Sequence, residues 1–141
     1  MTSVVQLLRS TALAPAPYAY AATVPPGSRL VFLAGACPLH PDGTTAAPGD
    51  HAEQARTCLD NLEQALAEAD ARLTDVVSTR VLVASGRRDD LAEVWEVVSG
   101  RFGDHDVPST LVGVSVLGYP AQLVEIEAVA AVGEQPSARP S

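Results

Sequence analysis

The chain has 141 residues, of which 47% are hydrophobic, and a formal net charge of −8 from 17 acidic and 9 basic residues. This length suits a single domain with a modest core. The acidic balance argues against a nucleic-acid partner, and the absence of lysine excludes catalysis through a lysine Schiff base.

Three short strands are expected in the first part of the chain. Apolar segments at residues 4–8, 18–24 and 29–35 are separated by residues typical of turns. The Pro-Pro-Gly-Ser turn before residue 29 predicts that the second and third strands pair as a hairpin. Residues 39–49, rich in Pro, Gly, Asp and Thr, read as a loop.

The clearest helix opens at Asp50, which forms a capping-box pattern with Glu53. Apolar residues then recur every three or four positions, as on one face of a helix. They are Ala55, Cys58, Leu59, Leu62, Ala65, Leu66 and Ala69. We expect this helix to cover one face of a sheet.

A strand at residues 75–84 and a second amphipathic helix follow. Asp89 or Asp90 is expected to cap this helix, and Gly103 to lie near its end. Its apolar stripe consists of Leu91, Val94, Trp95, Val98 and Phe102.

The segment 109–130 predicts two strands joined by a turn, and the second of them carries two acids. Side chains alternate across a strand, so Glu125 and Glu127 share one face with Leu123 and Val129. The other face carries Val124, Ile126, Ala128 and Ala130. Carboxylates on an apolar strand need water, a donor or a cation nearby, which favours a crevice or a subunit interface.

This order of elements predicts an α+β fold with two helices on one face of a mixed sheet. We place Val77, Val81 and Val83 on one side of the 75–84 strand and Arg80 and Leu82 on the other. The uncovered side is then too apolar for a monomer, and self-association is expected. One domain is expected over residues 1–132, with a flexible tail at 133–141.

The cysteines and histidines do not form a recognisable motif. Cys37 and Cys58 are expected to be small buried hydrophobes rather than redox groups, and His40, His51 and His105 are scattered. We therefore expect no metal and no cofactor. Without a signal-peptide pattern or a run of eighteen apolar residues, a cytoplasmic protein with no membrane partner is expected.

Four blocks of the sequence together resemble the RidA family, also called the YjgF or reactive-intermediate deaminase family. They are APYAYA (16–21), VFLAGACPLHPDG (31–43), GDHAEQARTCLDNLEQALAEADA with DVVSTRVLV (49–71 and 75–83), and VGVSVLGYPAQLVEIEAVA (112–130). The resemblance implies a chorismate-mutase-like fold and a homotrimer with small-molecule pockets at the subunit interfaces. It also implies hydrolysis of imines and enamines; some members have been described as ribonucleases or chaperone-like.

Several polar positions of the deaminating members differ here. Those members hold the substrate carboxylate with an Arg at the start of the penultimate strand, where this chain has Ser109. Apolar residues replace three further polar groups of the family pattern, at Ala34, Trp95 and Leu111. Of the polar set only Tyr18 and Glu125 remain, while Gly35 and Pro38 keep the shape of the loop.

A hydroxyl does not replace a bidentate guanidinium, so we predict that 2-imino acids are poor substrates and that the pocket suits a neutral or bulkier molecule. Glu125 would position or activate water or donate a proton, and Tyr18 would hydrogen-bond a carbonyl or imine nitrogen. Ser109 is expected to form pocket wall. The alternative is a non-catalytic trimer that binds a small apolar metabolite or a partner protein.

Two residues keep open roles at this point. Glu127 is expected to pair with Arg80 on a neighbouring strand; the alternative is that Arg80 replaces the missing carboxylate clamp. Trp95 is expected to pack in the core, with ligand stacking as the alternative.

Overall fold

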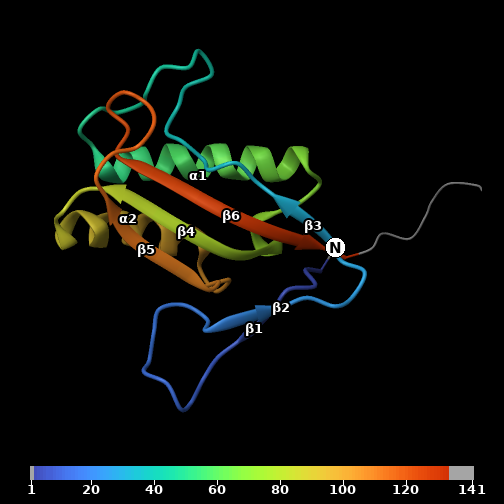
Figure 1. Cartoon of the computed structure of the whole chain (residues 1–141). Coiled ribbons are helices and arrows are strands. Elements are labelled where there is room, and N and C mark those ends of the chain that lie inside the picture. The colour runs from blue at the N-terminus through green and yellow to red at the C-terminus, as the bar shows by residue number, and fades with distance from the viewer. Residues whose placement is uncertain (1, 134–141) are drawn as a thin grey trace, which may run out of the picture.

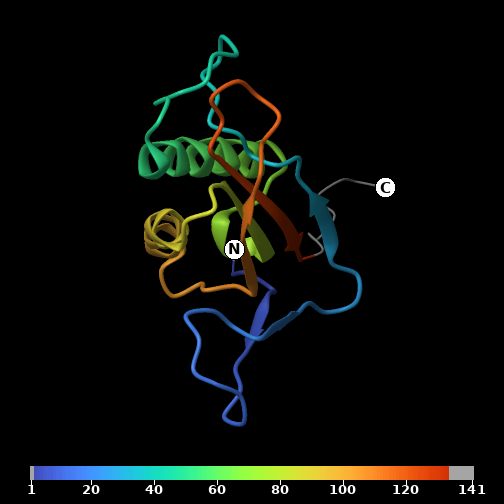
Figure 2. The ribbon, with the colours of Figure 1, turned by 60° about the vertical axis from the view of Figure 1, so that its left-hand side comes forward.

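Two layers form the main body of the computed structural model, which describes residues 2–133. One layer is a mixed four-stranded sheet, and the other is a pair of helices packed on a single face of it (Figures 1 and 2). The strand order is β3 (Arg29–Phe32), β6 (Val124–Val132), β4 (Val76–Ala84) and β5 (Ser109–Val114). Only β4 and β5 run parallel to each other among these pairs. The predicted α+β architecture is confirmed.

The first helix, α1 (His51–Glu68), begins where its capping pattern predicts. The Asp50 carboxylate accepts a hydrogen bond from the backbone N–H of Glu53 at 3.0 Å. Its apolar stripe enters the core through Ala55, Cys58, Leu59, Leu62 and Leu66. A short 3-10 helix, η1 (Leu73–Asp75), leads into β4.

The second helix, α2 (Arg88–Phe102), begins earlier than expected. Arg87 occupies the N-cap position, and both predicted caps, Asp89 and Asp90, lie in the first turn. The prediction fails because Ser85 supplies the local polar contacts: its hydroxyl accepts from the N–H of Arg87 at 2.9 Å and donates to Asp90 at 2.7 Å. A carboxylate in the first turn still stabilises the helix dipole. Gly103 ends the helix with a positive φ, as expected.

The predicted hairpin between residues 18–24 and 29–35 is wrong. β2 (Ala21–Thr23) pairs with β1 (Gln6–Leu8) in a separate antiparallel ribbon, which lies apart from the main sheet in Figure 1. β3 pairs with β6 instead. Pro25 and Pro26 have no backbone N–H to offer a neighbouring strand, and the N–H of Ser28 donates within the turn to the Pro25 carbonyl at 3.3 Å. The chain crosses here from the ribbon to the sheet, where pairing with β6 brings Val31 into the core.

The alternation predicted for β6 is confirmed. One face of the strand is buried under the helices and carries Val124, Ile126, Ala128 and Ala130. Glu125 and Glu127 are half-buried on the opposite face.

In β4 one residue departs from the predicted faces. A register shift between Val76 and Ser78 places Val76 in the core and leaves Val77 only half-buried. Grouping Val77 with the buried Val81 and Val83 was therefore wrong, because an extra residue at a bulge reverses the alternation.

The sheet face away from α1 and α2 is uncovered within residues 2–133. Leu30 and Phe32 are 50% and 74% exposed there. Arg80 and Glu127 pair across this face at 3.0 Å, in register between β4 and β6. The structure therefore places Arg80 in an ion pair on the scaffold, as expected.

Of the tail predicted at residues 133–141, only Gly133 lies within the described residues. No helix of the described chain is long and apolar enough to cross a membrane.

Candidate functional site

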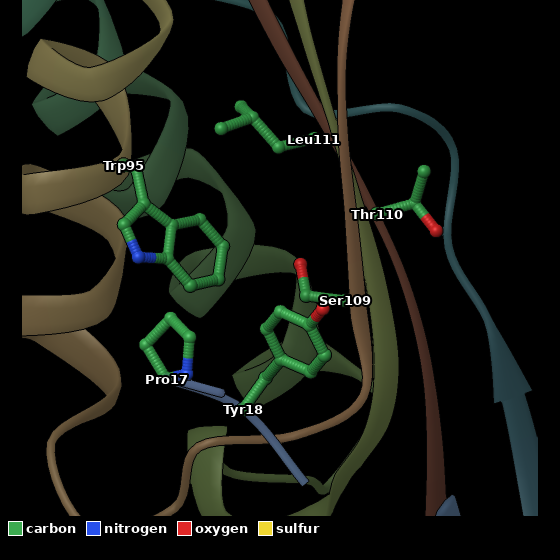
Figure 3. Close-up of a pocket in the computed structure, with 6 residues that line it drawn as sticks. All are labelled: Pro17, Tyr18, Trp95, Ser109, Thr110 and Leu111. Carbon is green, nitrogen blue, oxygen red and sulfur yellow. The ribbon is translucent and has the colours of Figure 1, made fainter. Parts of the chain in front are cut away.

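A cavity of about 470 Å³ lies between α2 and the edge strand β5 (Figure 3). Most of its wall is apolar or aromatic. The lining residues are Pro17, Tyr18, Trp95, Ser109, Thr110 and Leu111. Four of these six are residues that the sequence singled out for a site.

Strand register explains why Ser109 and Leu111 reach this cavity. They lie opposite Thr79 and Val81 of β4, whose side chains are buried on the helix-covered face. In Figure 3 both side chains accordingly point toward α2, whereas Thr110 points to the other side of the sheet. The Thr79 hydroxyl donates to Ser109 Oγ at 2.7 Å, so Ser109 is held against the cavity wall.

The aromatic part of the wall comes from two separate segments. The Tyr18 ring meets Trp95 edge-to-face, with centroids 6.3 Å apart. The Tyr18 segment is anchored to the loop before β5, because the N–H of Ala19 donates to the carbonyl of Asp106 at 2.7 Å. Trp95 is half-buried and faces the cavity beside the tyrosine, so it forms part of the cavity wall.

A second group of residues surrounds Glu125 on the opposite face of the sheet. Ala36 and Ile126 exchange two backbone hydrogen bonds of 2.7 and 3.0 Å, which brings the segment with the exposed Ala34 alongside β6. A Cβ atom on Gly35 would lie 2.3 Å from Glu125 Oε2. A larger residue at this position would push the Glu125 carboxylate away from the place that it occupies.

Two donors hold the other oxygen of Glu125. Oε1 accepts from the Gln122 amide at 3.1 Å and from the Cys37 thiol at 3.3 Å. Burial, together with the Glu125 carboxylate, raises the pKa of Cys37 to about 11. At neutral pH this cysteine is a protonated hydrogen-bond donor and not a thiolate.

The sequence reasoning missed Gln122 and misread Cys37 as a simple buried hydrophobe. The one available signal was the spacing of Gln122, three residues before Glu125 at the end of a turn. Nothing local indicated that Cys37 would lie beside that carboxylate, because 88 residues separate the two.

Within one chain, the predicted site residues form two separate groups. Tyr18, Trp95, Ser109 and Leu111 line the cavity on the helix side. Glu125, Gly35 and Ala34 do not line it.

One group of possible metal ligands occurs within the described residues. Ligand atoms of His51, Asp90 and Glu93 lie within 4.8 Å of one another. Glu93 is exposed, and the group sits at the N-termini of α1 and α2, whose positive dipole ends disfavour a cation. We assign it no function.

Comparison with known proteins shows which family this chain is similar to in sequence and fold. The family model described as Endoribonuclease L-PSP matches residues 10–132. A RutC family protein from Pyrococcus abyssi is 34% identical over 114 residues, which cover 81% of this chain and 85% of that protein. The 2-iminobutanoate/2-iminopropanoate deaminase of Mus musculus is 32% identical over 136 residues, covering 94% of this chain and 96% of the enzyme.

Solved structures agree with this result. A Rid family protein of unknown function from Yersinia pestis, YyfB, superposes with a TM-score of 0.83 at 26% identity, over 92% of this chain and 99% of its own. Escherichia coli TdcF, solved with bound serine, superposes with a TM-score of 0.64 at 27% identity, over 95% and 100% of the two chains. The chain belongs to the RidA/YjgF family.

Proposed function

We propose that the protein acts as a homotrimer in which Glu125 and Gly35 of one subunit complete the Tyr18 cavity of its neighbour. The uncovered sheet face carries Glu125 together with the exposed Leu30 and Phe32, so a second copy packed there would bury apolar surface. The cavity opens at the other side of the subunit, beside the edge strand. A head-to-tail contact that brings one edge against one face closes into a ring when the rotation is threefold.

The substrate we propose is an imine, an enamine or another reactive small molecule without a carboxylate. The observation that carries this proposal is the chemistry of the cavity wall. None of the described residues that line it is basic. The family resemblance, in addition, places Ser109 at the position where deaminating members carry Arg. The mouse relative is named for 2-imino acids, whose carboxylate needs a counter-charge that this wall does not supply.

The polar groups divide the chemical work between them. Glu125 orients water for attack on the imine carbon, and the Tyr18 hydroxyl hydrogen-bonds the imine nitrogen. Trp95 and Leu111 provide apolar contact for the rest of the molecule. Neither step uses a metal or an organic cofactor.

A panel of imines generated in solution tests this function. Ammonia release is expected to be faster with neutral imines than with 2-iminobutanoate, and Glu125→Ala is expected to abolish it. Faster turnover of 2-iminobutanoate than of every neutral imine would overturn the proposed substrate class. Sedimentation of the protein as a monomer would remove the shared site.

The alternative is a trimer that binds a small apolar molecule without turning it over. The apolar cavity wall favours it, because such a surface binds a ligand without any help from Glu125. Saturable binding of an apolar fluorophore, with no turnover of any imine, would support this alternative. The family model carries a ribonuclease name, but a net charge of −8 offers little attraction to a phosphate backbone.

A further inference from the structure

The two oxygens of Glu125 have different surroundings. Oε1 accepts the hydrogen bonds from Gln122 and Cys37, whereas Oε2 lies against Gly35 and accepts no hydrogen bond from residues 2–133. A carboxylate on a flexible side chain usually samples several rotamers. Here its own chain selects one orientation and leaves one oxygen available.

The Gln122 amide has little freedom to move. It is 4% exposed, and its Nε2 donates to both the Val124 carbonyl and Glu125 Oε1 at 3.1 Å. Its Oε1 accepts from the N–H of Tyr119 at 3.0 Å. Rotating or flipping this amide would break three hydrogen bonds in a buried place, so its direction is well defined.

A second buried amide holds the turn that carries Gln122. Ala121 adopts a positive φ of 59°, which is unfavourable for a residue other than glycine. Gln54 on α1 is fully buried; it donates to the Ala121 carbonyl at 2.9 Å and accepts from the N–H of Leu123 at 2.7 Å. The residues on both sides of Gln122 are thus fixed to the helix.

The backbone of Cys37 is fixed in a similar way. Asn61, also on α1, donates from Nδ2 to the carbonyls of Cys37 and Leu39 at 2.9 and 3.0 Å. The helix therefore fixes the backbone from which the thiol reaches Glu125 Oε1 at 3.3 Å; the same sulfur lies 3.5 Å from the Gly35 carbonyl, the longer of its two contacts. The ionisable group that acts on this thiol is Glu125 from β6, and the thiol in turn raises the pKa of Cys58 on α1.

We infer that Gln122 and Cys37 are positioning residues for Glu125: both donate to Oε1, so that Oε2 is the oxygen presented to a ligand or water. This inference rests on the proposed role of Glu125, but the geometry that it requires is testable without a substrate. Cys37 serves here as a donor, and its raised pKa agrees with that use.

The first experiment measures alkylation of Cys37 by iodoacetamide at pH 8, with each site quantified by mass spectrometry. Cys37 is expected to react far more slowly than free cysteine, and Glu125→Gln to accelerate it roughly tenfold, the effect of about one pKa unit on the thiolate fraction. Cys58, which is fully buried, is the internal control. Alkylation of Cys58 in the Glu125→Gln variant would mean that this substitution has opened the fold. The alkylation rate of Cys37 would then be measured in Glu125→Ala instead.

The second experiment uses the imine panel. Cys37→Ala and Gln122→Met are each expected to lower kcat roughly tenfold or more with little change in KM, because each removes a hydrogen bond to a charged group. Cys37→Ser, which keeps a donor, is expected to restore much of the loss. In the Glu125→Gln background Gln122→Met should cause no further loss.

The outcomes separate the two proposals. Absence of turnover with any imine would overturn the proposed function, while the alkylation result would still decide the geometry. Cys37 reacting like free cysteine and unchanged by Glu125→Gln would overturn the positioning inference. Equal activity in Cys37→Ala, Cys37→Ser and the unmodified protein would overturn it as well.

Discussion

Replacing Ser109 by Arg is expected to create activity toward 2-iminobutanoate. The Ser109 side chain points into the cavity from the first position of β5, and the volume of about 470 Å³ accommodates a guanidinium with a four-carbon substrate. Two opposite charges about 4 Å apart attract by about 4 kcal/mol at an effective dielectric constant of about 20.

The net gain is smaller than this attraction. Ordering a long arginine side chain opposes binding by about 2 kcal/mol, which leaves about 2 kcal/mol in favour of the charged substrate. At about 1.4 kcal/mol per factor of ten, kcat/KM for 2-iminobutanoate should rise roughly 30-fold. The lost hydrogen bond from Thr79 lowers stability by about 1 kcal/mol without affecting this ratio.

The assay compares ammonia release from 2-iminobutanoate by the unmodified protein, Ser109→Arg and Ser109→Met. The methionine variant adds bulk without charge, so it should not gain. Equal rates in the two variants would refute the reasoning, because the gain would then not depend on the charge. A higher salt concentration should reduce the gain of the arginine variant alone.

Three further predictions concern the scaffold. Gly35→Ala should abolish imine turnover while the circular dichroism spectrum is retained, because its Cβ would displace the Glu125 carboxylate; unchanged turnover would contradict the geometry of the loop. Arg80→Ala should lower the free energy of unfolding in urea by at most about 1 kcal/mol, since the pair with Glu127 is largely exposed. Burial and the Glu125 carboxylate raise the pKa of Cys37 from its usual value near 9 to about 11. Protonation of this thiol therefore stabilises the folded state fully below about pH 9, and this stabilisation is lost as the pH rises through 11. The free energy of unfolding should fall over this pH range, and it should fall less steeply in Cys37→Ala.

Local patterns predicted the elements that depend on neighbours in sequence. The capping box at Asp50 and the apolar stripe that follows it lie within one helix, and the alternation around Glu125 lies within one strand. These patterns were confirmed because side-chain direction in a helix or strand follows from backbone geometry alone. The α2 cap was missed because Ser85, outside the helix, took over the local hydrogen bonds.

Pairing between distant strands could not be predicted in the same way. The turn before β3 indicated a hairpin, yet β3 pairs with β6, about a hundred residues further along the chain. The bulge at Val77 was also invisible in the sequence, since it depends on the register with β6. Such choices are made by the burial of whole faces, to which a local turn contributes little.

For this protein the sequence by itself determined the helices, the faces of β6 and the family, and it led to the prediction that Ser109 replaces a charged clamp. The tertiary structure alone decided that Tyr18 and Glu125 lie on different sides of the sheet, and that Cys37 and Gln122 hold a single oxygen of Glu125. The physical reason is distance along the chain. A periodic pattern encodes which way a side chain points. Which side chain it meets depends on how the sheet is assembled and on which turns the Gln54 and Asn61 amides of α1 hold in place.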